Sequence, residues 1–414
     1  MLSLQVIPDG SVTSPAGFDA GVASAGLRSG SHEPDVAVVS SDRPCTTAAV
    51  FTQNPVRAAP VAYDLELRAR HPGDRYGVVV NAGIANACTG PPGLATATRM
   101  ATATEQALGR PPHSILVLST GVIGPLLPED RVAEAVAEAA RARGPGHGIA
   151  AARAIMTTDT CPKHAAVRVH TPRGPITIGG IAKGSGMIHP DMATMLAIIG
   201  TDARIDEDRL TSGLGATVNR TFNAITVDGD TSTNDAVVCL ANGASGVDVG
   251  TDPATFEAFA DGLHHLARHL AIAIARDGEG ATRLVEIAIT GAPNASAARR
   301  VGRAIGRSLL VKAALHGEEA NWGRVLAAAG TAGVPLDPRR LTLDVQQRLP
   351  AGGPAGPWIP VVRHGTLVPV SEPLPPGGTD LILRLDLDAG SADATVWGCD
   401  LTEAYVRLNA GSKT

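Results

Sequence analysis

The most informative stretch of this sequence is Lys183-Gly184-Ser185-Gly186-Met187-Ile188-His189-Pro190-Asp191-Met192-Ala193-Thr194-Met195-Leu196. Its two glycines and its proline predict a tight turn after a strand. A small residue, Ala193, and a hydroxyl residue, Thr194, follow, and the apolar run over 195–199 predicts a fully buried strand. The stretch therefore places a threonine hydroxyl between a tight turn and a strand inside the protein.

The chemistry of Thr194 depends on whether a base lies beside its hydroxyl. One economical base is its own α-amine, which becomes free only if the preceding peptide bond is cut. Attack of the Thr194 hydroxyl on the Ala193 carbonyl would give an ester that water hydrolyses, and the small Ala193 side chain would not obstruct the attack. On these residues alone a simpler interpretation stays open, in which Thr194 is a β-branched residue that begins a strand.

The composition excludes several classes of protein. The chain has 414 residues, which favours two or three domains, and 44% of them are hydrophobic, which is too many for a disordered chain. Lys and Arg number 35 and Asp and Glu 40, so the net charge is −5, and aromatic residues make up only 3%. A weakly acidic chain with few aromatic side chains is a poor candidate for binding nucleic acid.

Cysteine usage and hydropathy predict a cytoplasmic protein without a membrane span. The cysteines are widely spaced and form no C-x-x-C pair, which disfavours a disulfide framework and a zinc site and fits a reducing cytoplasm; they are Cys45, Cys88, Cys161, Cys239 and Cys399. The first residues carry no basic region and no long apolar stretch, so we expect no secretory signal. Apolar runs such as 192–199 are far shorter than the roughly 20 residues of a membrane helix.

Short β-rich runs alternate with alanine-rich helical runs along the chain. Strands are predicted at 36–39, 78–80, 115–118, 165–169 and 195–199, with a hairpin over 167–178. Helices are predicted at 94–108, 129–143, 253–276 and 297–315. Loops rich in proline and glycine at 349–357 and 373–378 precede a β-rich tail at 381–387, 394–397 and 404–408. This alternation predicts an α+β (mixed α/β) protein of two layered lobes.

Common cofactor and metal motifs are absent from the sequence. It contains no P-loop, no H-E-x-x-H, no G-x-S-x-G and no dinucleotide-binding glycine pattern. His265 and His269 have helical spacing but no carboxylate at a helpful distance, so a solvated helix face is the better interpretation. The acidic stretch 228–235 resembles the start of a calcium loop, but Thr233 and Cys239 stand at the sixth and twelfth positions from Asp228, where such a loop needs glycine and glutamate. We therefore expect no metal and no cofactor.

The stretch around Thr194 resembles the self-cleavage signature of the ornithine acetyltransferases, the bifunctional glutamate N-acetyltransferases/amino-acid acetyltransferases of arginine biosynthesis. The resemblance covers nearly the whole chain and includes segments at 54–60, 119–124, 156–160, 219–223, 227–235, 276–282, 321–324 and 405–409. Each segment is weakly specific alone, but their joint presence in this order is highly specific.

The resemblance implies an αββα sandwich of two lobes, of the self-processed N-terminal-nucleophile type. Cleavage between Ala193 and Thr194 would give an α chain, 1–193, and a β chain, 194–414, which the family assembles as an α2β2 heterotetramer. Thr194 would be the nucleophile and, through its free amine, the base. Thr120 and Gly121 match the family's oxyanion-hole pair. Its substrate-binding positions correspond to Thr160, Lys183, Thr194, Glu279, Asn409 and Thr414.

The chemistry of these residues agrees with the implied roles, although each also has an ordinary structural interpretation. Gly121 lets backbone N–H groups face a ligand, or it simply ends a strand. Lys183 suits the α-carboxylate of an amino acid, but lysines in turns are usually solvated. Glu279 suits the δ-ammonium of ornithine, or it is an ordinary loop carboxylate. Asn409 and Thr414 lie at the chain end, where only a tail docked onto the site would give them a role.

The expected reaction transfers acetyl from N2-acetyl-L-ornithine to L-glutamate by a ping-pong exchange through an acetyl-Thr194 ester. One amide replaces a similar amide, so the exchange needs no ATP, metal or cofactor. Acetyl-CoA would be a co-substrate only if the enzyme is bifunctional.

Departures from the family pattern leave other functions open. Ile84 replaces a polar residue, Asp191 replaces an asparagine, and the tail after Asn409 lacks the usual aromatic residue. One alternative is therefore a secondary-metabolism paralogue that acts on a related N-acyl amino acid. A second is an N-terminal-nucleophile amidohydrolase or aminopeptidase, which passes the acyl group to water. A third is an uncleaved relative that serves as a binding or scaffold protein.

Overall fold

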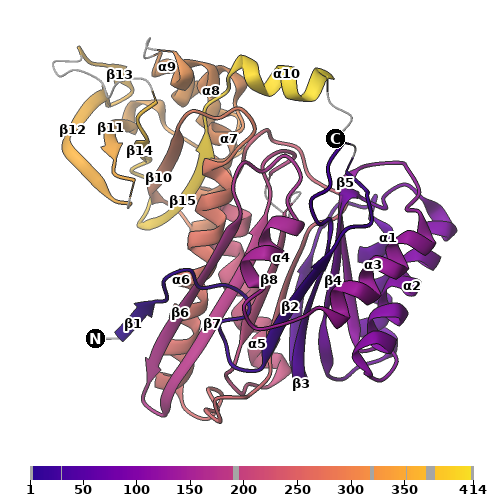
Figure 1. Ribbon diagram of the computed structural model, residues 1–414. Helices are drawn as coiled ribbons and strands as arrows, with labels where there is room; N and C mark the ends of the chain where they lie inside the picture. Colours follow the sequence, from indigo (N-terminus) through magenta and orange to yellow (C-terminus); the bar gives the residue numbers. More distant parts are fainter. Residues whose placement is uncertain are drawn as a thin grey trace.

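The chain contains two β-sheets, each with its own hydrophobic core (Figure 1). The computed structural model describes residues 3–28, 30–189, 195–317, 321–350, 352–369 and 378–411. Figure 1 shows the larger sheet and its helices in indigo through magenta to salmon, with the smaller sheet in brown-orange to yellow beside its upper end. The active-site residues predicted from the sequence come from both parts of the chain.

Within the described residues the larger sheet has nine strands, in the order β1-β6-β7-β8-β9-β3-β4-β5, with β2 paired to β3. The central element is β3, which pairs with β4 through residues 36–45 and with β9 through residues 46–51. It therefore joins two halves of the sheet. In chain order the strands β1 to β9 are Ser3–Val6, Phe18–Ala23, Val36–Phe51, Arg75–Ile84, Ile115–Val122, Lys163–Thr171, Gly174–Lys183, Leu196–Thr201 and Ala236–Ala241.

The two halves of this sheet pack face to face between outer layers of helices. Side chains from both halves fill the space between them, and all are buried: Val39, Val80, Leu118, Ile181, Ile198 and Val238. One outer layer contains α1 (Ala59–Arg70), α2 (Gly90–Leu108) and α3 (Glu129–Arg141). The other contains α5 (Glu207–Arg220) and α6 (Pro253–Arg276), and the short α4 (Gly148–Ala154) joins the inner core. This arrangement confirms the predicted α+β fold with αββα layers.

The smaller sheet has the strand order β13-β12-β11-β14-β10-β15. In chain order β10 to β15 are Leu284–Ala292, Thr342–Arg348, Pro354–Arg363, Thr366–Leu367, Leu381–Asp386 and Ala392–Cys399. The helix α7 (Ala295–Gly306) packs on β10 and β15, with α8 (Leu309–His316) and α9 (Gly323–Gly330) beside it. The last helix, α10 (Glu403–Gly411), crosses above the larger sheet in Figure 1.

Most predicted elements are present, and three predictions are wrong in detail. The predicted helix 297–315 is divided into α7 and α8, because the Ser308 hydroxyl accepts the Val311 N–H and starts a new helix. Residues 354–357 begin β12 instead of a loop, since Pro354 stands at the first strand position, where its missing N–H is tolerated. Residues 404–408 lie in α10 instead of a strand, because alanine, leucine and arginine favour helix.

The predicted cleavage point between Ala193 and Thr194 lies outside the described residues. The strands on either side of it are described, and β7 and β8 pair from Ile178 with Thr201 to Lys183 with Leu196. A cut at this point would therefore divide one sheet between the chains 1–193 and 194–414. That division stays a prediction.

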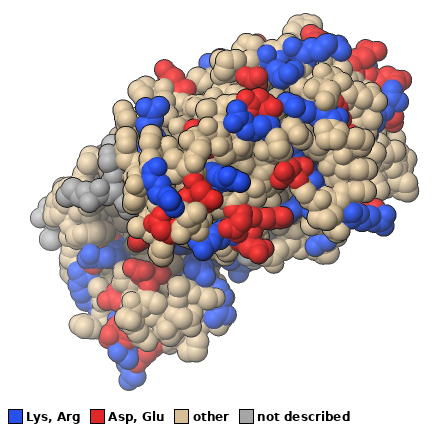
Figure 2. All heavy atoms as spheres, turned by 90° about the horizontal axis from the view of Figure 1, so that it is seen from below, with Lys and Arg blue, Asp and Glu red and all other residues tan. Residues whose placement is uncertain are grey.

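The surface carries charges of both signs. Figure 2 shows Lys and Arg interspersed with Asp and Glu on the face that it draws, without a broad region of one sign. In the described ranges, no helix is both long and apolar enough to cross a bilayer.

Candidate active site

Thr120 and Gly121 lie at the end of β5, beside β4. Gly121 is opposite Gly83, and its φ of 126° lies in the region that favours glycine. A Cβ at Gly121 would lie 2.2 Å from the Gly83 carbonyl carbon, so a larger residue would force the strands apart. Thr120 is buried, and it pairs with Ala82 of β4 and, where the register shifts, also with Ile84. The strand end is therefore closely packed around the predicted oxyanion-hole residues.

Lys183, at the end of β7, is buried beside Thr120. Its Nζ donates to Thr157 Oγ1 at 2.7 Å and to Thr120 Oγ1 at 3.3 Å, and only 2% of the residue is exposed. Burial lowers the pKa of Lys183, and the nearby carboxylate of Asp159 opposes this shift. The structure thus rejects the interpretation of Lys183 as a solvated turn residue and places it with Thr120, 63 residues away in sequence.

Three charged residues to which the sequence analysis assigned no role lie next to Lys183. Lys163 Nζ lies 2.6 Å from Asp159 Oδ1 and 2.6 Å from Asp277 Oδ2, and all three side chains are buried. Lys183 Nζ lies 3.8 Å from Asp159 Oδ2. Burial opposes ionisation of Asp159, but Lys183 and Lys163 outweigh it and lower the pKa of this carboxyl to about 2. Two cations and two anions therefore form one buried network.

Asp277 connects this network to Thr160. The Thr160 backbone N–H donates to Asp277 Oδ2 at 2.9 Å, and its hydroxyl donates to Asp277 Oδ1. Thr160 is exposed, whereas the Asp277 side chain is buried. A substrate-facing hydroxyl at Thr160 would therefore be held by the same carboxylate that binds Lys163.

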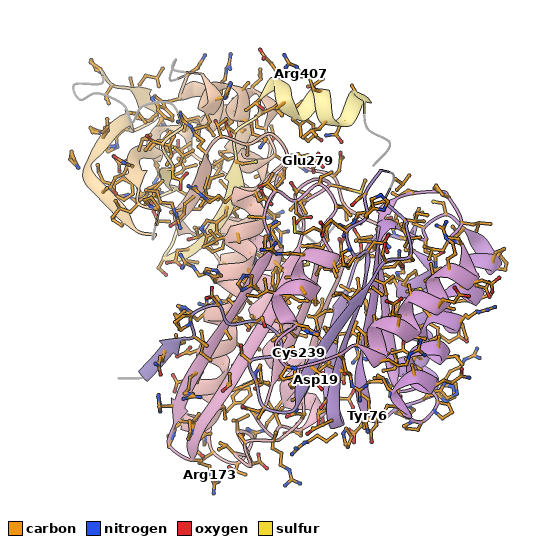
Figure 3. All side chains as sticks on the ribbon, in the orientation of Figure 1. Asp19, Tyr76, Arg173, Cys239, Glu279 and Arg407 are labelled. Carbon is orange, nitrogen blue, oxygen red and sulfur yellow. The ribbon has the colours of Figure 1, made fainter. Side chains whose placement is uncertain are left out.

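Glu279 lies in the loop after α6 and contacts both the turn after β7 and α10. Its N–H donates to the Ser185 carbonyl at 2.9 Å, and its carboxylate lies so close to Gly186 that a Cβ there would be 2.4 Å from it. Asn409 Nδ2 donates to Glu279 Oε2 at 2.7 Å. Figure 3 shows Glu279 below α10, at the upper end of the larger sheet. These contacts bring the last helix to the turn that begins the most informative stretch.

The loop 227–235 contacts both sides of the predicted cleavage point. The Asp228 carboxylate accepts the N–H groups of Met187 at 2.5 Å and Ile188 at 2.9 Å, and Asp235 Oδ1 accepts the N–H of Met195 at 2.9 Å. Burial raises the pKa of Asp228 to about 6 and raises the pKa of Asp235 well above its usual range. One loop therefore holds the residues before and after the segment 190–194.

The structure places five of the predicted site residues in two groups. Thr120 and Lys183 are in direct contact, Gly121 adjoins them, and Glu279 contacts Asn409. Ala193, Thr194 and Thr414 lie outside the described residues, so their predicted roles stay predictions.

Two of the three charged residues beside Lys183 lie in segments that the sequence had already singled out. Asp159 and Asp277 belong to the segments 156–160 and 276–282, which carried the family resemblance. Lys163 gave no signal, because a single lysine at the start of a strand is ordinary in any sequence. His265 and His269 are exposed on α6, and in the part of the chain that the structure describes no three His, Cys, Asp or Glu residues are grouped to hold a metal ion.

Comparisons with known proteins cover nearly the whole chain. A sequence model of the ArgJ family matches residues 19–414. Two relatives, each named arginine biosynthesis bifunctional protein ArgJ, come from Symbiobacterium thermophilum and Thermotoga neapolitana. The first is 47% identical over 98% of this chain and 99% of its own length. The second is 44% identical over 92% of this chain and 95% of its own length.

A solved structure of ornithine acetyltransferase complexed with ornithine, from Mycobacterium tuberculosis, is 36% identical over 45% of this chain and 98% of its own, with a TM-score of 0.41. The family match spans far more than half of the chain, and the first relative exceeds 30% identity across almost its full length. The chain therefore belongs to the ArgJ family.

Proposed function

We propose that this chain is a self-cleaving glutamate N-acetyltransferase of arginine biosynthesis, which moves an acetyl group from N2-acetyl-L-ornithine to L-glutamate. The observation that carries this function is the match to the ArgJ family over residues 19–414. The contact between Lys183 and Thr120 supports it, because two residues assigned to one site from separate sequence segments lie 3.3 Å apart.

The first step is the cut between Ala193 and Thr194. The Thr194 hydroxyl attacks the Ala193 carbonyl, and the C–N bond breaks as an ester forms between Ala193 and the Thr194 oxygen. Water then hydrolyses that ester, which leaves a carboxylate on Ala193 and a free hydroxyl and α-amine on Thr194. This amine lies next to the hydroxyl that it activates, which is the usual logic of an N-terminal nucleophile.

Acetyl transfer then uses the same hydroxyl twice. The Thr194 amine takes the hydroxyl proton while the oxygen attacks the acetyl carbonyl of N2-acetyl-L-ornithine, and Thr120 and Gly121 stabilise the negative oxygen. Ornithine leaves with a proton on its amine, and an acetyl-Thr194 ester remains. The amine of L-glutamate attacks this ester, and N-acetyl-L-glutamate leaves with Thr194 restored.

The decisive experiment measures cleavage and transfer on the same purified protein. Intact mass spectrometry should show two chains, and N2-acetyl-L-ornithine with L-glutamate should give ornithine with parallel-line, ping-pong kinetics. Thr194→Ala should remove both cleavage and turnover, whereas Thr194→Ser, which keeps a hydroxyl and an amine, should retain both. An uncleaved Thr194→Ala protein with full activity would disprove the mechanism.

A second candidate is an enzyme that uses a different N-acyl amino acid as donor. Ile84, which departs from the family pattern, is paired with Thr120 at the strand end, so an apolar side chain replaces a polar one beside the predicted oxyanion hole. A donor screen with longer N-acyl ornithines separates the candidates. Preference for the acetyl donor supports the first, and preference for a longer acyl chain supports the second.

Three further properties need measurements of their own. Release of acyl group to water without glutamate would indicate an amidohydrolase instead of a transferase. Synthesis of N-acetyl-L-glutamate from acetyl-CoA in the absence of acetylornithine would show that the enzyme is bifunctional. Light scattering on the cleaved protein tests the proposed α2β2 heterotetramer.

A further inference from the structure

The ammonium group of Lys183 lies between two threonine hydroxyls. Its Nζ is 2.7 Å from Thr157 Oγ1 and 3.3 Å from Thr120 Oγ1, and Lys183 and Thr120 are both almost fully buried. The nearest carboxylate, Asp159, is further away, at 3.8 Å. The closest contacts of the ammonium are therefore with hydroxyl oxygens and not with a carboxylate.

These contacts decide which way the hydroxyl hydrogens point. An ammonium has three N–H donors and no acceptor, so each threonine oxygen that it contacts must accept. The Thr120 hydrogen then has to point away from Lys183. Within the described ranges, Lys183 is the one hydrogen-bond partner of Thr120 Oγ1. A buried O–H donor is thus left for a ligand, although buried donors normally find a partner in the protein.

The buried ion network explains why Lys183 keeps these contacts. Lys163 lies between Asp159 and Asp277 at 2.6 Å from each, so it holds the carboxylate that would otherwise pair closely with Lys183. The Gly184 N–H also donates to Asp159 Oδ1 at 2.7 Å. Because Asp159 already accepts from Lys163 and from the Gly184 N–H, the Lys183 ammonium keeps its hydrogen bonds to Thr120 and Thr157.

We propose that Lys183 is a positioning residue of the oxyanion hole, which fixes the Thr120 hydroxyl as a donor toward the acetyl oxygen. This inference rests on the proposed function, because it concerns the negative oxygen of the acetyl-transfer step. It differs from the expectation that Lys183 binds the substrate's α-carboxylate. A donor with a positive charge behind it stabilises a developing oxyanion more strongly than a free hydroxyl does.

Separate measurement of kcat and KM distinguishes the two roles. Loss of an oxyanion-hole donor typically lowers kcat by about 100-fold or more. We expect Lys183→Met to lower kcat to this extent while KM for N2-acetyl-L-ornithine stays near its wild-type value. A carboxylate-binding role predicts the opposite, a raised KM with unchanged kcat, and this result would overturn the inference.

A double-mutant cycle tests whether Lys183 acts through Thr120. Thr120→Val should lower kcat as Lys183→Met does, and the double variant should be little worse than either single variant because both remove one function. Thr157→Val is the matched control, since it removes the other hydroxyl contact and should change kcat much less. Fully additive losses in the Lys183 and Thr120 cycle would count against the inference.

Processing and folding are scored separately from catalysis. Intact mass gives the cleaved fraction of each variant, and rates are expressed per cleaved chain. If Lys183→Met does not fold or cleave, Lys183→Gln takes its place, because the glutamine amide carries no charge and can also accept a hydrogen bond, so it no longer forces the Thr120 hydroxyl to accept. A change in kcat at constant KM in that variant supports the inference, and a change in KM at constant kcat overturns it. Absence of acetyl transfer in the wild-type protein would instead disprove the proposed function.

Discussion

Replacement of Lys163 by methionine should destabilise the protein more than the loss of any surface ion pair. Lys163 begins β6, and its side chain is 1% exposed. Its Nζ contacts Asp159 and Asp277 at 2.6 Å each. Lys163→Met would leave two buried carboxylates with Lys183 as their remaining close cation, 3.8 Å from Asp159.

The magnitude follows from the burial of these groups. Removing one partner of a buried ion pair costs roughly 3–5 kcal/mol, because the remaining charge stays out of water. Methionine retains most of the apolar stem, so little of this cost is lost packing. For a protein of 414 residues the loss corresponds to a fall in Tm on the order of 3–6 °C. An exposed pair such as Arg99 with Glu129 contributes at most about 1 kcal/mol, so Arg99→Met is the matched control.

The pH dependence has a definite sign. The pKa of Asp159 is lowered to about 2 in the folded protein and is near 4 in an unfolded chain, roughly its ordinary value. Its charge therefore stabilises the fold above about pH 4, and this contribution is lost as the pH falls through 2. Lys163 supplies part of it, so the difference in Tm between wild type and Lys163→Met should be constant above about pH 5 and should shrink as the pH falls from about 4 toward 2.

Calorimetry of the wild type, Lys163→Met and Arg99→Met measures these shifts. Adding Asp277→Asn to Lys163→Met removes one of the two buried carboxylates that no longer contact Lys163, and it should recover part of the lost stability. A fall in Tm no larger than that of Arg99→Met, at every pH, would refute the reasoning that Lys163 neutralises buried charge.

Gly121→Ala should lower the free energy of unfolding, measured in urea, by at least about 2 kcal/mol, because its Cβ would lie 2.2 Å from a carbonyl carbon and its φ is 126°. Gly330→Ala is the control: this residue lies in open space on α9, so the change should be neutral or should raise the free energy of unfolding by up to about 1 kcal/mol. The pKa of Asp228 is raised to about 6, so its protonation stabilises the fold fully below about pH 4, and this contribution is lost as the pH rises through 6. Asp228→Asn does not titrate, so its free energy of unfolding minus that of the wild type should rise by up to about 3 kcal/mol between pH 4.5 and 7.5. A difference that does not change with pH would contradict this. Asn409→Asp places a carboxylate against Glu279 and should speed proteolysis of α10, and adding Glu279→Gln should restore protection.

The sequence predicted those elements whose side chains are strongly patterned. The apolar run of β8 and the long amphipathic α6 were predicted because burial decides their residues position by position. α10 was not, because none of its residues is buried and its sequence therefore shows no periodic pattern. β9 was also missed, since a six-residue apolar run is ambiguous between strand and helix when judged by periodicity alone.

The sequence predicted which residues belong to the site, but it did not predict which of them contact one another in space. The resemblance supplied Thr120 and Lys183, yet only the fold shows that the end of β7 brings Lys183 to Thr120. Lys163 could not be predicted, because lysine is almost never fully buried and its burial here depends on Asp277, a carboxylate from a distant segment, as well as on Asp159, four residues before it. Sequence motifs therefore identify the residues assigned to the site more readily than the buried charges packed around them.

The fold also accounts for how a cut between Ala193 and Thr194 could leave the site intact. β7 and β8 pair along six residues, ending with Lys183 opposite Leu196, so the two new chains would stay joined in one sheet. Asp228 holds Met187 and Ile188 before the cut, and Asp235 holds Met195 after it. Because both carboxylates come from one loop, 227–235, separation of the ends would have to break hydrogen bonds on both sides as well as the sheet. Backbone cleavage would then free the Thr194 amine without freeing the strands that position it.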